Sequence, residues 1–240
     1  MMETIAVHDL AKRYGKLWAL QGVNASFHAG ETVAVIGPNG SGKSTLIKIL
    51  LGLVRATRGH IDVLGMRAGG DPASRERIGY MAQVARYPEQ LRIGDLLDMM
   101  RDVRGLSDDQ LDDTLVHELG LDIQLDKRMG ALSGGTRQKV SAVLAFRTKP
   151  QVLVLDEPTA GLDPASSARL IAEVRSARER GCTVLITSHL MDEVGHIADR
   201  VAYLSEGQLR FILPPSEILG ATGADRLSQG IATLLRTPVA

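Results

Sequence analysis

The strongest constraint on the fold of this chain is a glycine-rich run between an apolar strand and a helix. The run reads Gly37-Pro38-Asn39-Gly40-Ser41-Gly42-Lys43-Ser44-Thr45 and follows the apolar residues 32–36. It matches the pattern G-x-x-x-x-G-K-[ST], in which glycines let successive backbone N–H groups converge on phosphates. The helix expected over residues 43–51 adds partial positive charge at its N-terminus. The run therefore predicts an α/β core that binds a nucleoside triphosphate, with Lys43 on the β- and γ-phosphates and the Ser44 hydroxyl on Mg²⁺.

Two adjacent carboxylates, Asp156 and Glu157, follow a second apolar run at residues 152–155. Alone, such a pair at the end of a strand is usually a solvated loop or cap. Beside a phosphate-binding loop, it resembles the second nucleotide motif, in which Asp156 binds Mg²⁺ through water and Glu157 polarises the attacking water. General-base catalysis of this kind contributes roughly 10²–10⁴ in rate. The two runs together predict a Mg²⁺-dependent nucleoside triphosphatase.

The composition argues against several other classes of protein. Lys and Arg total 28, as do Asp and Glu, so no net field favours nucleic acid, and we expect no nucleic-acid partner. Cys182 is the one cysteine, which excludes an intrachain disulfide and a cysteine-ligated cluster; we expect it to enter a strand as a small residue. The chain begins without a basic and then apolar segment and has no run of about 18 apolar residues. We therefore expect a soluble chain without a secretory signal.

Alternating and apolar runs predict strands near both ends of the chain and few in its middle. The expected strands cover residues 4–10, 23–27, 32–36, 60–63, 78–81, 152–155, 183–187, 200–205 and 208–213. A turn at Glu206-Gly207 joins the last two. Helices are expected over 190–197 and over 164–180, the latter with Asp163 as its N-cap and Gly181 as its stop.

Helical periodicity replaces the strand signals between residues 83 and 146. A capping box at Ser107-Asp108-Asp109-Gln110 predicts a helix start there. The helix is expected to continue on a 3.6-residue period through Leu111, Leu115, His117, Glu118 and Leu119. Near the end of the chain, an apolar helical face is expected to pack on the core, with a partner-binding helix as the alternative. Its residues are Leu227, Ile231, Leu234 and Leu235.

A third run, Leu132-Ser133-Gly134-Gly135, lies between the glycine-rich loop and the acidic strand end. Ser133 can act as an ordinary N-cap for the helix that follows, but an N-cap does not explain two glycines. With the other two runs, it resembles the signature of the ATP-binding subunits of ABC transporters, and the resemblance covers residues 3–213. It implies a P-loop NTPase of the α/β class, with a RecA-like core, an antiparallel β subdomain and an inserted α-helical subdomain.

The resemblance also implies a single ABC ATPase domain over residues 1–240 with internal divisions. Residues 1–83 and 147–213 would form the nucleotide-binding core with the β subdomain. Residues 84–146 would form the helical subdomain with the signature, and residues 214–240 a short C-terminal tail.

By the same resemblance, further residues take part in binding and hydrolysis. Tyr14 would stack on adenine, Gln83 would contact Mg²⁺ or water, and His189 would contact the γ-phosphate. By themselves these residues are typical of a half-buried strand tyrosine, a surface glutamine and a capping or core histidine. The catalytic set is then Glu157, His189, Lys43 and Gln83, and the metal set is Ser44, Gln83 and Asp156.

A second copy of the chain would complete the site. The resemblance implies a head-to-tail dimer in which Ser133 and the Gly135 N–H grip the γ-phosphate of ATP held by the other copy's Lys43. Gly134 belongs to the same run, and Asp163 would cross the interface as well as cap its helix. ATP and Mg²⁺ are the implied cofactors. The dimer can be a homodimer or a heterodimer with a similar subunit.

The implied function is to power a membrane transporter through a transmembrane permease, whose cytoplasmic helix would dock near Gln83 and residues 84–89. The chain would then lie at the cytoplasmic face of the inner membrane.

Thr136 stands where the commonest family pattern has glutamine, and residues 136–140 are more similar to exporter subunits than to importers. Residues 80–89 and 96–105 resemble subunits that serve maturation of the nitrous-oxide-reductase copper site. The alternatives are an ABC-type ATPase acting on nucleic acid or ribosomes, and a non-catalytic binding module.

Overall fold

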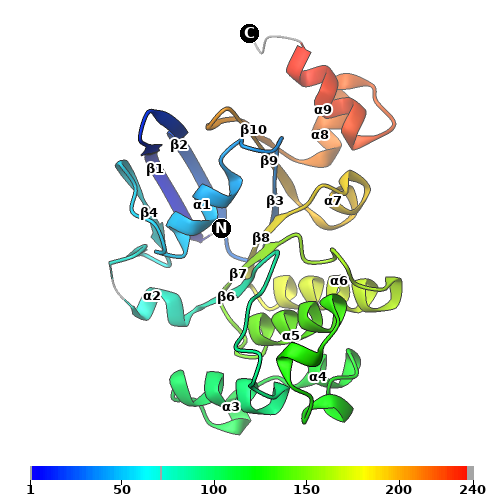
Figure 1. Ribbon diagram of the computed structural model, residues 1–240. Helices are drawn as coiled ribbons and strands as arrows, with labels where there is room; N and C mark the ends of the chain where they lie inside the picture. The colour runs from blue at the N-terminus through cyan, green and yellow to red at the C-terminus, as the bar shows by residue number, and fades with distance from the viewer. Residues whose placement is uncertain (1, 71, 237–240) are drawn as a thin grey trace. The chain divides into compact units, whose positions relative to one another are not determined.

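The computed structural model describes residues 2–70 and 72–236, which fall into two compact units (Figure 1). The first unit comprises Met1–Arg75 and Leu185–Ala240, and the second comprises Glu76–Val184. The short helix α2 (Ala73–Glu76) and the strand β8 (Thr183–Thr187) lie at the two boundaries. The finer division into core, helical subdomain and tail stays a prediction.

An antiparallel sheet forms one part of the first unit. Its strands are β1 (Glu3–Tyr14), β2 (Leu17–His28), β4 (Arg58–Val63) and β5 (Met66–Arg67), in the order β2-β1-β4-β5. Ile5, Leu10 and Phe27 are buried, and Ile5 pairs with Phe27 across β1 and β2. β1 and β2 extend beyond the expected runs because they continue as a hairpin as far as the Tyr14↔Leu17 pair. The predicted antiparallel β subdomain is confirmed.

Parallel strands and helices form the rest of the first unit. They are β3 (Thr32–Ile36), α1 (Lys43–Leu50), α7 (Met191–Ile197), β9 (Arg200–Ser205), β10 (Gln208–Leu213), α8 (Pro215–Thr222) and α9 (Leu227–Arg236). β3 pairs in parallel with β9, and β9 pairs antiparallel with β10. The turn between β9 and β10 has Glu206 and Gly207 at φ 51° and 74°, as a two-residue hairpin turn requires.

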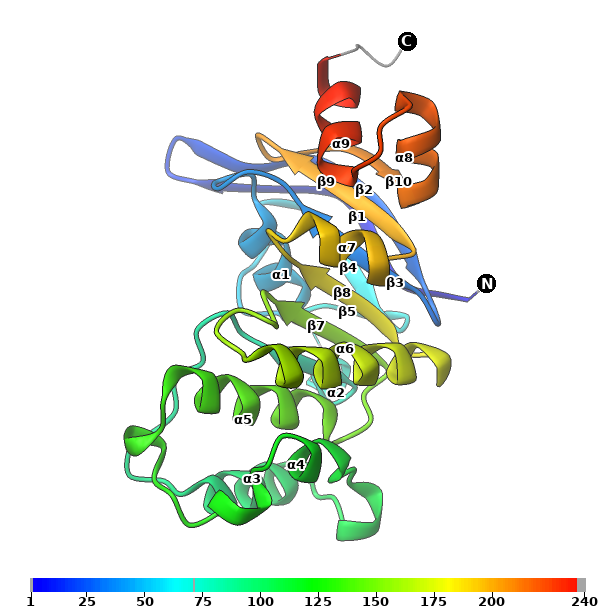
Figure 2. The same cartoon turned by 90° about the vertical axis from the view of Figure 1, so that its right-hand side faces the viewer.

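Residues 215–236 form two helices where the sequence predicted one apolar helical face. Figure 2 shows α8 and α9 side by side. Gly230 lets them approach, since a Cβ there would lie 2.9 Å from the Ile218 side chain. Leu227 and Ile231 are buried, whereas Leu235 is 44% exposed. The prediction that this apolar face packs on the core is therefore confirmed for Leu227 and Ile231.

The second unit places helices around two parallel strands. The strands are β6 (Ile78–Met81) and β7 (Val152–Asp156), and the helices are α3 (Ile93–Val103), α4 (Thr114–Glu118), α5 (Gly134–Phe146) and α6 (Pro164–Glu179). Asp163 is the N-cap of α6, with Pro164 at its first position, as predicted. Among the described residues, none of the helices combines the length and apolarity that crossing a membrane requires.

The helix predicted after Ser107 is interrupted. The capping box forms, and the Ser107 N–H donates to Gln110 Oε1 at 3.0 Å, but it caps only a 3₁₀ turn at Asp108–Gln110. The backbone leaves the helix because the Asp112 N–H donates to the Arg147 carbonyl and the Asp112 carboxylate accepts from the Thr114 N–H. The prediction of a continuous helix through Leu111 was therefore wrong, and α4 begins only at Thr114.

Candidate functional site

The glycine-rich loop of the first unit has a backbone that needs glycine. Gly37, Gly40 and Gly42 have φ of 149°, 78° and 109°, in the region that L side chains rarely adopt. A Cβ on Gly37 would lie 1.9 Å from the Leu204 carbonyl oxygen, and one on Gly42 would lie 2.4 Å from that of Ala19. At Gly37 and Gly42, both the positive φ and the close packing thus require glycine.

Hydrogen-bond donors for an anion gather in this loop. Lys43 Nζ donates to the carbonyls of Gly37 at 2.7 Å and Pro38 at 3.0 Å, so the ammonium lies against the loop. The Ser41 hydroxyl is buried without a hydrogen-bond partner among residues 2–70 and 72–236. α1 begins at Lys43, which adds the positive end of a helix. A phosphate group fits this donor set, because it would supply the acceptor that the buried hydroxyl lacks.

Two other predicted residues of the first unit are exposed. Tyr14 ends β1 with 45% of its surface exposed, and Lys12 Nζ lies 4.9 Å from its ring centroid. His189 is exposed between β8 and α7. Trp18 was not predicted, yet it is 41% exposed and the Arg13 guanidinium lies 5.5 Å from its ring. The sequence could have pointed to Trp18, because this second aromatic residue stands four positions after Tyr14.

Gln83 and the acidic pair Asp156 and Glu157 lie at the same edge of two parallel strands in the second unit. Met81 of β6 pairs with Leu155 of β7, so Asp156 at the carboxyl end of β7 and Gln83 just after β6 lie at the same edge. Asp156 is half-buried and its negative charge adds to burial in raising the pKa of Tyr80. Ligands of α/β proteins bind at such edges. The strand register therefore places two of the predicted metal residues at one edge of the strand pair.

Glu157 has an unusual backbone. It is buried, and its φ of 51° is uncommon for a residue other than glycine, asparagine or aspartate. The side chain of Gln138 in α5 donates to the Glu157 and Pro158 carbonyls at 3.5 Å each. Strain of this kind persists where the surroundings fix the backbone and concentrates at functional sites.

The two glycines of the third run have different surroundings. Ser133 is the N-cap of α5, as predicted: its Oγ accepts from the Thr136 N–H at 3.2 Å and lies 2.9 Å from the Thr136 hydroxyl. A Cβ on Gly135 would lie 2.8 Å from the Gly161 carbonyl oxygen, whereas one on Gly134 would meet nothing within 4 Å. Packing within the second unit thus explains Gly135 and leaves Gly134 unexplained.

Asp163 lies close to this run. Its carboxylate accepts from the Ser166 N–H at 2.9 Å and the Ser166 hydroxyl at 2.6 Å, and Lys139 Nζ of α5 lies 3.1 Å away. The hydrogen bonds from Ser166, and after them Lys139, hold the pKa of Asp163 well below its usual range. The contacts Lys139–Asp163 and Gly135–Gly161 bring the N-termini of α5 and α6 together at the surface of the second unit.

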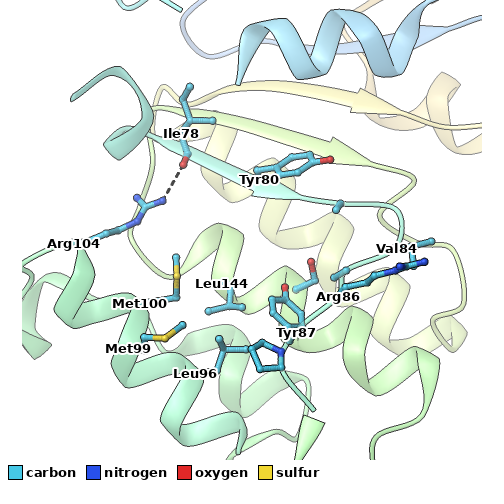
Figure 3. A pocket seen from close by; sticks show the side chains of 14 residues that line it. Ile78, Tyr80, Val84, Arg86, Tyr87, Leu96, Met99, Met100, Arg104 and Leu144 are labelled. Carbon is cyan, nitrogen blue, oxygen red and sulfur yellow. Dashed lines mark hydrogen bonds between the residues drawn. The ribbon is translucent and has the colours of Figure 1, made fainter. Parts of the chain in front are cut away.

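An apolar groove of about 410 Å³ opens between β6 and the helices α3 and α5 (Figure 3). Its apolar lining includes Val84, Leu96, Met99, Met100 and Leu144. Arg104 closes one end, donating to the carbonyls of Glu76 at 2.6 Å and Ile78 at 3.1 Å. Tyr87 also lines it, and burial raises the pKa of this phenol despite a hydrogen bond with Ser141. Val84 is 72% and Met99 42% exposed, so the groove presents apolar surface to solvent.

Comparison with known proteins assigns the chain to a family. The model of the family described as "ABC transporter" matches residues 20–160. The linearmycin resistance ATP-binding protein LnrL of Bacillus subtilis (strain 168) is 31% identical over 230 residues, covering 94% of this chain and 74% of its own. The Nod factor export ATP-binding protein I of Burkholderia orbicola (strain AU 1054) is 33% identical over 208 residues, covering 85% and 68%.

The fold agrees with this assignment. A solved structure described as the ATP binding subunit of an ABC transporter superimposes with a TM-score of 0.90 at 29% identity, covering 97% of this chain and 99% of the other. Together these findings confirm the P-loop NTPase fold that the three sequence runs predicted. The chain therefore belongs to the ABC transporter family, as an ATP-binding subunit that hydrolyses ATP to drive transport.

Proposed function

We propose that two copies of this chain, or one copy and a similar subunit, close around two Mg-ATP molecules and so power an exporter. The observation that carries the proposal is the exposed start of α5, where Ser133 and Gly134 face solvent and Gly134 has no packing role in its own unit. Exposed backbone N–H groups at the N-terminus of a 13-residue helix suit a phosphate held by another molecule. The Burkholderia relative, an ATP-binding protein of Nod factor export, supports the direction of transport.

Each predicted site residue has a role in this proposal. Lys43 and the loop N–H groups hold the phosphates, and Tyr14 stacks on the base. Ser44, Gln83 and Asp156 would hold Mg²⁺, which fits their hydroxyl, amide and carboxylate oxygens. When bound, Mg²⁺ neutralises charge that develops on the phosphate oxygens. Glu157 accepts a proton from the attacking water, and His189 donates to the γ-phosphate.

The energetic logic is a population shift. ATP contacts both copies in the closed dimer and only one in the open state, so it favours closure by its differential affinity. A change from 1:99 to 99:1 needs about 5.5 kcal/mol. Hydrolysis removes the γ-phosphate contacts of Ser133, Gly135 and His189, and the dimer reopens.

The substitution Glu157→Gln tests both the general base and the dimer. It keeps the size of the side chain and removes its basicity, so we expect ATP binding to persist, turnover to fall at least about 10²-fold, and a dimer to accumulate in excess Mg-ATP. Light scattering with size-exclusion chromatography measures the dimer, and phosphate release measures turnover.

Lys43→Ala is the matched variant, because it removes the phosphate contact itself. We expect it to lose turnover and bind ATP weakly, and to remain monomeric in Mg-ATP. Wild-type turnover in this variant would contradict the assignment of the phosphate loop. A Glu157→Gln protein that binds ATP but stays monomeric, both alone and with its permease, would contradict the dimer.

The groove between β6, α3 and α5 is the proposed docking site for a cytoplasmic helix of the permease. Its exposed Val84 and Met99 offer apolar contacts, and the half-buried Arg104, which donates to the Ile78 carbonyl, forms one end. Such a partner places the chain at the cytoplasmic face of the inner membrane. The similarity of residues 80–89 and 96–105 to copper-site maturation subunits stays a prediction.

A further inference from the structure

Three metal-ligating side chains meet on the antiparallel sheet of the first unit, outside the nucleotide-binding loop. His8 on β1 and His60 and Asp62 on β4 each offer one ligand atom, and these atoms lie within 4.8 Å of one another. His8 pairs directly with His60 across the two strands, and Asp62 is two residues further along β4. Residues with this spacing share one face of a sheet, so the cluster follows from the strand register.

Both histidines face the same carboxylate oxygen. His60 Nε2 lies 3.3 Å and His8 Nε2 lies 3.9 Å from Asp62 Oδ2, and the two rings are 4.8 Å apart between centroids. The other oxygen, Oδ1, accepts from Arg67 Nε at 2.8 Å. Arg67 therefore orients the carboxylate so that Oδ2 points towards the imidazoles, as outer partners orient ligands in metal sites.

The spacing of the three atoms suits one small cation. Zinc bonds nitrogen and oxygen ligands at about 2.0–2.2 Å, so two ligand atoms of a tetrahedral centre lie roughly 3.4 Å apart. The distances of 3.3 and 3.9 Å from Asp62 Oδ2 to the two Nε2 atoms fall near this value, and all three ligand atoms lie within 4.8 Å of one another. The side chains of His8, His60 and Asp62 are 54%, 31% and 28% exposed, so an ion and a water ligand can reach them.

We propose that His8, His60 and Asp62 bind a divalent transition-metal cation of the zinc type. Two imidazoles and one carboxylate suit zinc, copper or nickel, whereas Mg²⁺ and Ca²⁺ prefer oxygen ligands throughout. A water molecule supplies the fourth ligand. The positive charge of Arg67 beside Asp62 limits the affinity, and the bound ion links β1 to β4.

Zinc titration of the full-length, tag-free chain, first treated with a chelator and free of nucleotide, tests the proposal by calorimetry. We expect one zinc per chain in the wild type, and affinity at least about tenfold lower in each of His8→Ala, His60→Ala and Asp62→Asn. His117→Ala is the matched control, because His117 also faces a carboxylate, that of Asp122 at 3.6 Å. This control should bind zinc like the wild type.

Two further readouts separate a metal site from a merely structural role. Electron paramagnetic resonance of bound Cu²⁺ should show two coupled imidazole nitrogens in the wild type and one in either histidine variant. The melting temperature should rise with zinc in the wild type and in His117→Ala, and should not rise in the other variants.

The melting temperature without zinc checks that every variant is folded, and Asp62→Asn keeps the shape of the side chain. Equal zinc binding by the wild type, His8→Ala and His60→Ala would overturn the proposal. Absence of binding by the wild type at millimolar zinc would do the same.

Discussion

At the scale of single residues, Gly134 and Gly135 are adjacent in the chain but differ in what fixes them. An alanine at Gly135 would place Cβ 2.8 Å from the Gly161 carbonyl oxygen, so we expect Gly135→Ala to lower the free energy of unfolding by about 1–3 kcal/mol. Gly134→Ala has open space and should change it by less than about 0.5 kcal/mol. Urea unfolding measures both.

The same pair tests the proposed role of the signature run. Gly134→Ala should reduce ATP-dependent dimer formation although its stability is unchanged. If Gly134→Ala instead dimerises and hydrolyses ATP like the wild type, Gly134 has no role at the interface. Thr136→Gln, which restores the commonest family residue, is a control that should keep activity.

Cys182 illustrates a residue whose reactivity is governed mainly by burial. Removal from water disfavours the thiolate and raises the pKa of this thiol to about 12. The neutral thiol therefore persists at pH 9, where a free cysteine is largely ionised. We expect negligible labelling by iodoacetamide at pH 9 in the folded chain and one label per chain in denaturant. Rapid labelling of the folded chain would contradict the burial.

Short motifs were predictable at this scale because their chemistry is local. The loop residues, the N-caps Ser133 and Asp163 and the turn at Glu206 depend on a few neighbours in the chain. The contact of Gly135 with Gly161 depends on residues that meet only after folding. No local pattern could therefore distinguish it from the open position at Gly134.

At the scale of elements, a nearly buried ion pair joins the start of β3 to β9. Arg200 Nε lies 2.9 Å from Glu31 Oε2, and a second nitrogen donates to Oε1 and to the Ser26 carbonyl. Arg200→Met would leave the Glu31 carboxylate, 7% exposed, without this cation. We expect a loss of about 3 kcal/mol in the free energy of unfolding, largely restored by adding Glu31→Gln.

The exposed pair Arg210–Glu206, 3.4 Å apart, is the control for that measurement. Arg210→Ala should have little effect, because exposed ion pairs contribute little. Chemical denaturation compares the three variants. Equal losses of unfolding free energy in Arg200→Met and Arg210→Ala would mean that burial does not determine how much an ion pair contributes to stability.

The buried strand β3 was predicted more closely than the helix after Ser107. The run at residues 32–36 matches β3 residue for residue, because a buried strand needs only an unbroken apolar run. The helix expected through Leu111 fails because Asp112 and Arg147, 35 positions apart, form a backbone hydrogen bond. Periodicity carries no information about such distant partners.

At the scale of the whole molecule, the proposal that the groove of the second unit docks a membrane permease can be tested by placing charges in it. Val84→Asp and Met99→Asp put charges on exposed groove positions, so neither should disturb folding. We expect both to lose co-purification of the permease from native membranes while keeping ATP binding, since burying an unpaired carboxylate against an apolar helix is costly. The bait is the Glu157→Gln chain locked with Mg-ATP, and mass spectrometry identifies its partners.

Val103→Asp is the matched control for the groove, because Val103 is 77% exposed on α3 but does not line the groove. The bait that also carries Val103→Asp should recover a polytopic membrane protein in the same amount as the bait without this substitution. Recovery of the permease by Val84→Asp and Met99→Asp in the same amount would move the docking site elsewhere on the chain. Recovery of ribosomal or DNA-repair proteins, without a membrane protein, would favour an ATPase that acts on nucleic acid or ribosomes. The identity of the permease would also decide whether copper-site maturation is the process served.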